Sequence, residues 1–136
     1  MRPTTKFIGT GALLLLLGTA FTLPTAQAQG KAPTDQVCND KENPPKDAVT
    51  QGGCVVIHRT KGTCNACHLI QGASASGNIA PPLVAMKQRF PDKAKLRAQV
   101  WDATTINPHS VMPPYGRHKI ISDEEVDKVV EFLLTL

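Results

Sequence analysis

The amino-acid sequence predicts an all-α fold, and three observations support that class. Residues 122–133 at the C-terminus place apolar side chains at the spacing of one helix face. Residues 92–101 have the same spacing and begin at an aspartate, which is favoured immediately before a helix. No segment alternates apolar and polar residues in the way a half-buried strand does. We therefore expect helices joined by loops, and no sheet.

The N-terminus has the features of an export signal. Arg2 and Lys6 form a basic start, residues 8–17 are an apolar run, and Ala26-Gln27-Ala28 has the pattern of a cleavage site. An uncleaved anchor is the weaker alternative, because glycines interrupt the run and a membrane span needs about 20 apolar residues. We predict a signal peptide over residues 1–28 and a periplasmic mature chain that keeps 108 of the 136 residues.

The charge balance says little about partners. The chain has 15 basic and 11 acidic residues, and the leader carries two of the basic ones, so the mature chain has a net charge of +2. This balance gives no indication of nucleic-acid binding. A group of cations is either the solvated face of a helix, which we favour, or a docking patch for an acidic partner. These cations are Lys87, Arg89, Lys93, Lys95 and Arg97.

The mature length is that of one domain, preceded by a polar N-terminal extension. Residues 29–47 are polar and proline-rich and show no helical period. Residues 48–136 form the expected domain, which begins with a short helix over 48–59. The Gly52-Gly53 pair weakens that helix, because glycine is a poor helix former.

Prolines and capping residues delimit the later elements. A brief helix over 83–90 is expected to end before Pro91, and Asp92 then caps the next helix. Residues 107–116 form a rigid loop with three prolines. The run Ser122-Asp123-Glu124-Glu125 is a capping box that begins the last helix.

Five consecutive residues, Cys64-Asn65-Ala66-Cys67-His68, have the pattern of a c-type haem attachment site. Two thiols three positions apart can each add to a vinyl group of one porphyrin, and the next residue directs its imidazole to the iron. A zinc site would need a second ligand pair, and Cys38 and Cys54 lack that spacing. A thioredoxin-type pair would need a βαβ context. The motif therefore predicts one covalent haem c, with Cys64 and Cys67 as thioethers and His68 as an axial iron ligand.

The mature chain has few aromatic residues with which to build a core. They are Phe90, Trp101, Tyr115 and Phe132. A domain of this size buries only about two-thirds of its unfolded surface, and a buried porphyrin would add apolar bulk. We expect the fold to depend on the haem and the apoprotein to be poorly ordered.

The second axial ligand is predicted to be Met112. Prolines on both sides of it limit the freedom of its loop and can hold the thioether at one depth. The plainer interpretation is a buried loop methionine. Met86 lies at helical spacing among apolar residues, which is typical of core packing, and His58 is too close to the attachment motif to reach the opposite face. His109 and His118 flank the loop and remain alternative ligands.

Two cysteines are left over after haem attachment. In an oxidising compartment an even count favours pairing, so we expect a Cys38–Cys54 disulfide, with two free thiols as the alternative. This bridge would close a loop of about 17 residues and contribute about 3 kcal/mol through chain entropy. It would tie the polar extension to the first helix of the domain.

The attachment motif, a proline pair before Leu83 and a methionine loop before an amphipathic C-terminal helix resemble class I cytochromes c. Within that class, four segments resemble the SoxX family, the small monohaem subunits of SoxAX complexes in bacterial thiosulfate oxidation. These segments are residues 77–83, 89–91, 107–118 and 129–133. The run Asn107-Pro108-His109-Ser110-Val111-Met112-Pro113-Pro114-Tyr115-Gly116-Arg117-His118 is the specific part. The resemblance covers residues 48–136, and the polar extension lies outside it.

The resemblance implies the electron-accepting subunit of an L-cysteine S-thiosulfotransferase. Such a complex joins thiosulfate oxidatively to a cysteine of a SoxYZ-like sulfur-carrier protein, at the haem of a SoxA-like partner subunit. This chain would accept the electrons and pass them to a soluble acceptor cytochrome. The resemblance also implies that His68 and Met112 are the axial ligands, and that the Pro81 carbonyl holds the other ring nitrogen of His68. It assigns no acid, base or nucleophile to this chain.

Two other functions remain open at this point. A free-standing periplasmic electron carrier fits the haem motif equally well, whereas a haem sensor with an open sixth position is disfavoured by Met112. A permanent cytochrome partner requires apolar surface around the haem edge, and we expect Tyr115 and Ile79 to form it.

Overall fold

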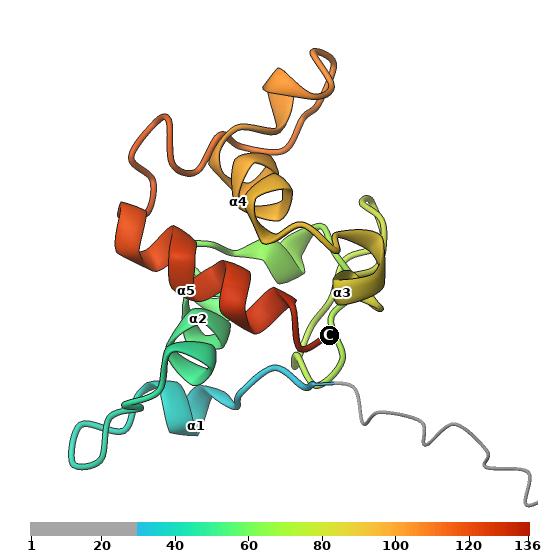
Figure 1. Ribbon diagram of the computed structural model, residues 1–136. Helices are drawn as coiled ribbons and strands as arrows, with labels where there is room; N and C mark the ends of the chain where they lie inside the picture. Colours follow the sequence, from blue (N-terminus) through green and yellow to red (C-terminus); the bar gives the residue numbers. More distant parts are fainter. Residues whose placement is uncertain (1–29) are drawn as a thin grey trace, which may run out of the picture.

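The computed structural model describes residues 30–136, so the predicted leader lies outside the described residues. The described chain is a set of helices joined by long loops (Figure 1). The elements are α1 (Asp35–Cys38), α2 (Ala48–Ile57), the 3₁₀ turn η1 (Cys64–Ala66), α3 (Met86–Arg89), α4 (Lys93–Trp101), the 3₁₀ turn η2 (Ala103–Thr105) and α5 (Asp123–Leu133). Residues 30–136 contain no strand, only one isolated parallel bridge between His68 and Ala80. The all-α prediction is confirmed.

Helix α5 is the centre of the core. The capping box holds as predicted: the Ser122 hydroxyl accepts from the Glu125 amide, and the Glu125 carboxylate accepts from the Ser122 amide. From this start the helix buries one apolar face, consisting of Val126, Val129, Val130, Phe132 and Leu133. It packs across α2 and beside α4 (Figure 1). The predicted amphipathic pattern is therefore the pattern that builds the core.

The crossing of α2 and α5 explains a glycine pair that weakened the helix prediction. A Cβ atom on Gly52 would lie 1.9 Å from the carbonyl oxygen of Lys128 in α5. Only a residue without a side chain lets the two backbones approach so closely. Helix α2 itself ends at Ile57, two residues earlier than expected, because His58 takes an extended conformation.

Helix α3 is half as long as predicted, and residues 83–85 are not helical. The Leu83 amide donates to the Leu69 carbonyl at 3.0 Å, and the Met86 amide donates to the carbonyl of the C-terminal Leu136 at 2.8 Å. Ala85 has a positive φ of 50°. Since these amides are satisfied by distant segments, the helix begins only at Met86. The expected stop before Pro91 and the cap at Asp92 are both present.

The N-terminal extension contains a short helix that the sequence pattern did not predict. Thr34 caps α1 through a bond from the Val37 amide, and one turn follows. Before α1, the Gly30 amide donates to the Thr135 carbonyl and the Ala32 amide donates to the Gln71 carbonyl. The extension therefore runs against both the C-terminus and the loop after the haem motif.

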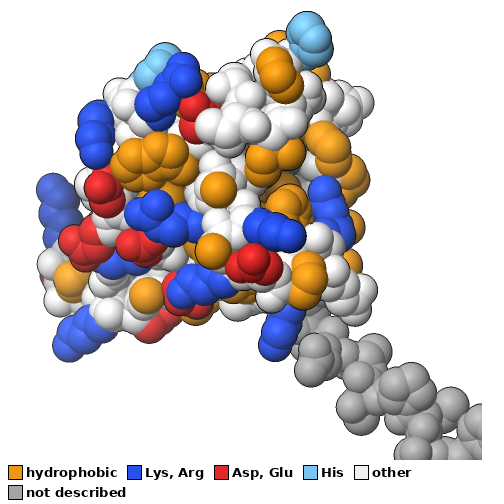
Figure 2. All heavy atoms as spheres, turned by 45° about the horizontal axis from the view of Figure 1, so that its top comes forward, with side chains coloured by type: hydrophobic (Ala, Val, Ile, Leu, Met, Phe, Trp, Pro, Cys, Tyr) orange, Lys and Arg blue, Asp and Glu red, His pale blue; other side chains and the backbone are white. Residues whose placement is uncertain are grey.

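The cations between residues 87 and 97 lie mostly on the surface. Lys93 pairs with Glu131 of α5, and Arg97 pairs with Asp127 of the same helix at 2.6 Å. Figure 2 shows basic and acidic side chains interleaved on one face of the molecule, with hydrophobic groups between them. This arrangement fits the solvated helix face that we favoured. In the described part of the chain, no helix has both the length and the apolar character to cross a bilayer.

Candidate haem site

A cavity of about 450 Å³ lies between α4, α5 and the loops that follow the attachment motif and precede α5. Its inner wall is apolar and includes Leu83, Leu96, Val100, Val129 and Leu133. The volume lies in the range of cofactor and small-molecule sites. The core of this small domain is thus hollow on one side.

The cysteines of the motif lie in this cavity with free thiols. Cys64 begins η1 and is half-buried, whereas Cys67 is exposed. The His68 amide donates to the Cys64 carbonyl at 2.9 Å, so the motif forms one tight turn. Burial raises the pKa of the Cys64 thiol to about 12, which keeps it neutral in the apolar wall. The turn thereby presents both sulfur atoms and the imidazole to a single cavity.

The imidazole of His68 is fixed by the backbone. Its Nδ1 atom lies 2.6 Å from the carbonyl oxygen of Pro81. The parallel bridge between His68 and Ala80 holds the two segments together at this point. With Nδ1 donating to a carbonyl, Nε2 is the nitrogen free to bind a metal. The resemblance to SoxX implied this contact, and the structure contains it.

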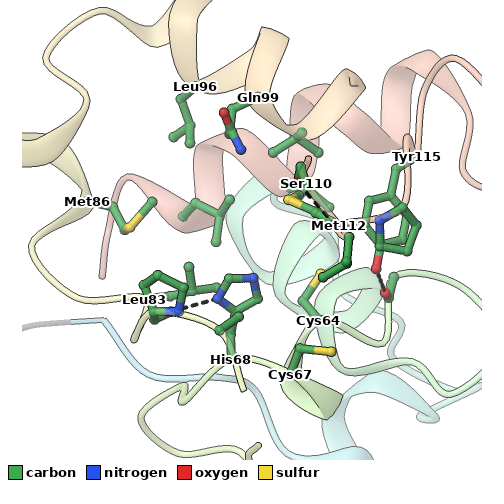
Figure 3. Close-up of a pocket in the computed structure, with 18 of the residues that line it drawn as sticks. Cys64, Cys67, His68, Leu83, Met86, Leu96, Gln99, Ser110, Met112 and Tyr115 are labelled. Atoms are coloured by element: carbon green, nitrogen blue, oxygen red, sulfur yellow. Dashed lines mark hydrogen bonds between the residues drawn. The ribbon is translucent and has the colours of Figure 1, made fainter. Parts of the chain in front are cut away.

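Two methionines line the cavity, and the geometry distinguishes them. Figure 3 shows His68 and Met112 projecting into the cavity from different segments. Met86 lies on the side of the cavity where Leu83 is labelled. The Met86 sulfur is 3.4 Å from a guanidinium nitrogen of Arg89, and its side chain is buried in the core. Met112 is half-buried on a loop, with its amide bonded to the Ser110 hydroxyl. Met86 therefore packs as core, and Met112 is the methionine whose loop presents it to the cavity.

The structure separates the three candidate histidines. His58 is outside the cavity lining, and its Nδ1 atom lies 3.2 Å from the Thr60 amide nitrogen. His118 is also outside, with its Nε2 atom 3.4 Å from a guanidinium nitrogen of Arg117. His109 lines the cavity on the same loop as Met112. Only His109 thus remains as an alternative ligand from this loop.

The expected role of Tyr115 as an exposed anchor is wrong. Tyr115 is buried, and its hydroxyl donates to the Gly62 carbonyl at 2.6 Å. Burial raises the pKa of this phenol, so the hydroxyl stays a donor. The side chain ties the methionine loop to the segment just before Cys64. Ile79, the other predicted surface residue, is 80% exposed at the cavity.

Sequence reasoning did not single out Arg89 as a cavity residue. It is the only Lys, Arg, Asp or Glu side chain among the residues that line the cavity. Its guanidinium donates to the Pro82 carbonyl at 2.7 Å, which holds the charge at the cavity edge. From the sequence we grouped Arg89 with the surface cations, because no local pattern indicates which cationic side chain turns toward the cavity.

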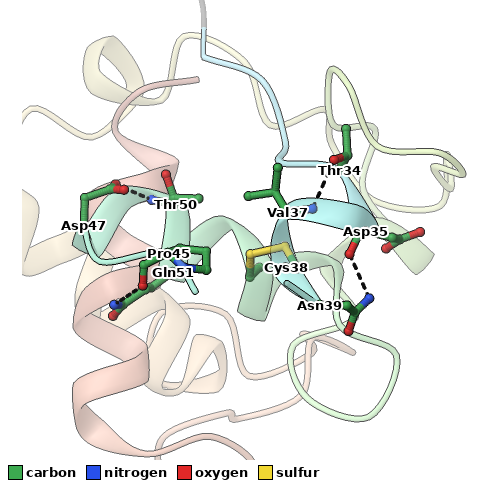
Figure 4. Close-up of a disulfide and its surroundings, with 10 residues drawn as sticks. Thr34, Asp35, Val37, Cys38, Asn39, Pro45, Asp47, Thr50 and Gln51 are labelled. Carbon is green, nitrogen blue, oxygen red and sulfur yellow. Dashed lines mark hydrogen bonds between the residues drawn. A yellow bond between two sulfur atoms is a disulfide. The ribbon is translucent and has the colours of Figure 1, made fainter. Parts of the chain in front are cut away.

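The remaining cysteines are bonded to each other. Cys38 at the end of α1 and Cys54 in α2 form a disulfide with a Cα–Cα distance of 5.4 Å (Figure 4). Figure 4 also shows the helix caps on either side of the bridge: the Val37 amide donates to Thr34 Oγ1, and the Thr50 amide donates to Asp47 Oδ1. The bridge joins the extension to α2, as expected from the cysteine count.

A metal centre built from side chains alone has no support here. Among residues 30–136, no three His, Cys, Asp or Glu side chains gather as a ligand set. The leftover cysteines are consumed by the disulfide, so a second ligand pair for zinc is missing from the described chain.

The family comparison agrees with this geometry. The family described as cytochrome C oxidase, cbb3-type, subunit III matches residues 57–133, which is more than half of the chain. The chain belongs to this cytochrome c family. The matched segment runs from the end of α2 through the attachment motif, the methionine loop and α5. No curated protein matches the chain.

Solved structures extend the likeness. The chain is similar to one in the structure titled "Crystal structure of SoxXA from P. pantotrophus", with 25% identity, a TM-score of 0.58, and coverage of 64% of this chain and 80% of that one. It is also similar to the c-type cytochrome SorU from Sinorhizobium meliloti, with 25% identity and a TM-score of 0.47. The match covers 65% of this chain and 88% of that one. The family match and the likeness to the SoxXA chain together support a SoxX-like monohaem cytochrome with the class I cytochrome c fold.

The residues present fit a covalently bound haem c. Two free thiols and an imidazole with one nitrogen already bonded face a cavity with an apolar inner wall. When bound, haem c supplies one-electron chemistry. The chain is therefore a c-type cytochrome that transfers electrons.

Proposed function

We propose that this cytochrome is the electron-accepting monohaem subunit of a heterodimeric L-cysteine S-thiosulfotransferase in the periplasm. The likeness to a chain of the SoxXA structure, which spans 80% of that chain at 25% identity, is the observation that carries this proposal. The cavity supports the electron-transfer part. It is lined by no carboxylate and by one fixed cation, Arg89.

We propose His68 and Met112 as the axial ligands, with Cys64 and Cys67 as the thioether-forming residues. The His68 ring is already oriented by the Pro81 carbonyl, and the Met112 thioether lies in the same cavity on a separate loop. Histidine–methionine ligation raises the reduction potential of a cytochrome c. This raised potential suits a subunit that accepts electrons from its partner.

The overall reaction divides cleanly between the subunits. At the partner, a carrier-protein thiol loses its proton and forms a sulfur–sulfur bond with thiosulfate, and two electrons are released for each bond. One proton leaves, and the product is an S-thiosulfonate on the carrier cysteine. A monohaem subunit accepts these electrons one at a time and releases each to a soluble acceptor cytochrome. The role of this chain is to fix the potential and to dock.

The docking surface of the proposed SoxA-like partner is the apolar rim of the cavity. Ile79 is 80% exposed and Val111 is 93% exposed, and both line the cavity. Two large aliphatic side chains this far exposed are costly in water and suit the centre of a protein interface. Arg89 is the only fixed charge in the cavity lining, so the cavity surface itself is nearly free of charge.

Reconstitution tests the proposal. The full chain is co-produced with a larger SoxA-type cytochrome, and thiosulfate is mixed with a SoxYZ-type carrier while the haem of this chain is followed by absorbance. We expect co-purification as a heterodimer, and reduction that requires both the partner and the carrier cysteine. A carrier with that cysteine replaced by serine is the control. If the chain always elutes alone and is reduced equally well by unrelated donors, the free-standing carrier is the correct function.

A further inference from the structure

The loop that carries Met112, residues 107–116, is held closed by contacts between two pairs of residues. We call the place where the two ends of this loop meet the neck. Residues 101 and 102 lie at the end of α4, and residues 116 and 117 lie where the loop ends. The Trp101 carbonyl accepts from the Gly116 amide at 3.2 Å and from the Arg117 amide at 3.3 Å. These two bonds bring the ends of the loop together, and Met112 lies between them in the sequence.

The second part of the neck is an ion pair. Arg117 lies 2.8 Å from Asp102 through its Nη1 atom, and Asp102 is only 2% exposed. The other carboxylate oxygen of Asp102 accepts from the Thr104 amide at 3.0 Å and from the Thr104 hydroxyl at 2.5 Å. Asp102 is the one fully buried charged residue in the described core. A carboxylate this buried needs all of these partners.

Packing reinforces the closure. A Cβ atom on Gly116 would lie 2.1 Å from a ring carbon of Trp101, so the loop returns directly over the indole. Arg97 and Lys119 lie over the same ring at 5.3 and 5.0 Å. The loop is also tied to the rest of the domain by the hydrogen bond from the Tyr115 hydroxyl to the Gly62 carbonyl.

The geometry points to Asp102 and Arg117 as positioning residues for the sixth ligand. We propose that this ion pair keeps the neck closed and thereby keeps the Met112 thioether at the iron. Breaking the pair opens the sixth position while the core of α2, α4 and α5 remains folded. This inference rests on the proposed ligation by Met112. Neither residue of the pair belongs to the attachment motif or lines the cavity, so its effect is transmitted through the loop.

The test uses the haem-loaded full chain with Arg117→Gln as the main variant. Arg117 is more than half exposed, so its replacement leaves the core intact, and Asp102→Asn is the second variant. Arg117→Lys restores the charge, and Lys95→Gln removes an exposed cation of α4 outside the cavity lining as the matched control. Three readouts are taken: the sulfur-to-iron absorption band, the affinity of the ferrous protein for carbon monoxide, and the midpoint of thermal unfolding in a temperature scan.

We expect Arg117→Gln to weaken the absorption band and to raise carbon monoxide affinity about tenfold, since a hydrogen bond between charged groups is lost. Arg117→Lys should restore most of both signals, and Lys95→Gln should leave them unchanged. If Arg117→Gln lowers only the unfolding midpoint, the pair is merely structural and the inference is overturned. If the unaltered protein lacks the band and Met112→Ala changes nothing, the proposed ligation fails instead, which is a distinguishable result.

Discussion

The hydroxyl of Tyr115 donates to the carbonyl of Gly62 at 2.6 Å, across 53 positions of the sequence. Both residues are buried, and the bond joins the methionine loop to the segment that leads into the haem attachment turn. The two segments that the proposed ligation requires on opposite sides of a porphyrin are thus linked at one edge of the cavity.

Replacing this tyrosine isolates the bond from the packing. Tyr115→Phe keeps the ring and leaves the buried Gly62 carbonyl without its partner, which should lower the free energy of unfolding by about 1–2 kcal/mol. Denaturant unfolding of the haem-loaded protein measures this change. An unfolding free energy equal to that of the unaltered protein would show that water replaces the lost donor.

The disulfide should stabilise the fold without influencing the haem. Cys38→Ser with Cys54→Ser should cost about 3 kcal/mol of unfolding free energy, as expected for a closed loop of about 17 residues. Neither cysteine lines the cavity, so the absorption spectrum should not change. Thiol titration of the unfolded, unreduced, haem-loaded protein should find no free thiol, and two reactive thiols would contradict the bridge.

The axial methionine can be assigned with a matched pair of variants. Met112→Ala should abolish the long-wavelength sulfur-to-iron band and lower the reduction potential, because thioether ligation favours ferrous iron. Met86→Leu should keep the band, because the Met86 sulfur is buried in the core and contacts Arg89. The assignment is reversed if Met86→Leu loses the band and Met112→Ala keeps it. A band that is already absent from the unaltered protein would instead direct attention to a ligand such as His109.

Arg89 should tune the haem potential. As the only fixed charge in the cavity lining, it is the natural partner for a haem propionate and disfavours the more positive ferric state. Arg89→Gln should therefore lower the reduction potential by roughly 20–40 mV, the size expected of one partly exposed charge pair. Lys87→Gln makes the same charge change outside the cavity lining and should have a clearly smaller effect. Equal shifts in the two variants would mean that only the net charge matters.

Much of the fold could be predicted because its signals are local. The capping box at Ser122, the cap at Asp92 and the attachment turn are each specified within a few residues of sequence. The disulfide followed from counting cysteines that the haem does not use. Caps and turns depend on residues that are close together in the sequence, so the sequence alone reveals them.

The errors concern contacts between distant segments. Residues 83–85 are non-helical because their surroundings, including the carbonyls of Leu69 and Leu136, compete for backbone bonds. Tyr115 is buried because Gly62 offers an acceptor, and Gly52 is required by the backbone of α5. None of these partners is visible in the local pattern. The four-residue helix α1 was missed for a different reason, since one turn is too short to show a period.

Partner docking separates the proposed subunit from a free-standing carrier. Ile79 and Val111 are the exposed aliphatic residues that also line the cavity, so a charged residue at either position should be desolvated in the heterodimer and left without a partner. We expect Ile79→Glu or Val111→Glu to weaken the complex with the larger cytochrome at least about tenfold, mainly through faster dissociation.

Val37→Glu on α1 is the control, because Val37 is also exposed but lies outside the cavity lining. Sedimentation and dissociation kinetics at moderate salt give the measurement. A permanent interface should exceed the roughly 1,200 Å² typical of transient redox encounters, and it should therefore persist at that salt concentration. If all three variants bind as the unaltered chain does, the partner docks on another face and the apolar rim is not the interface.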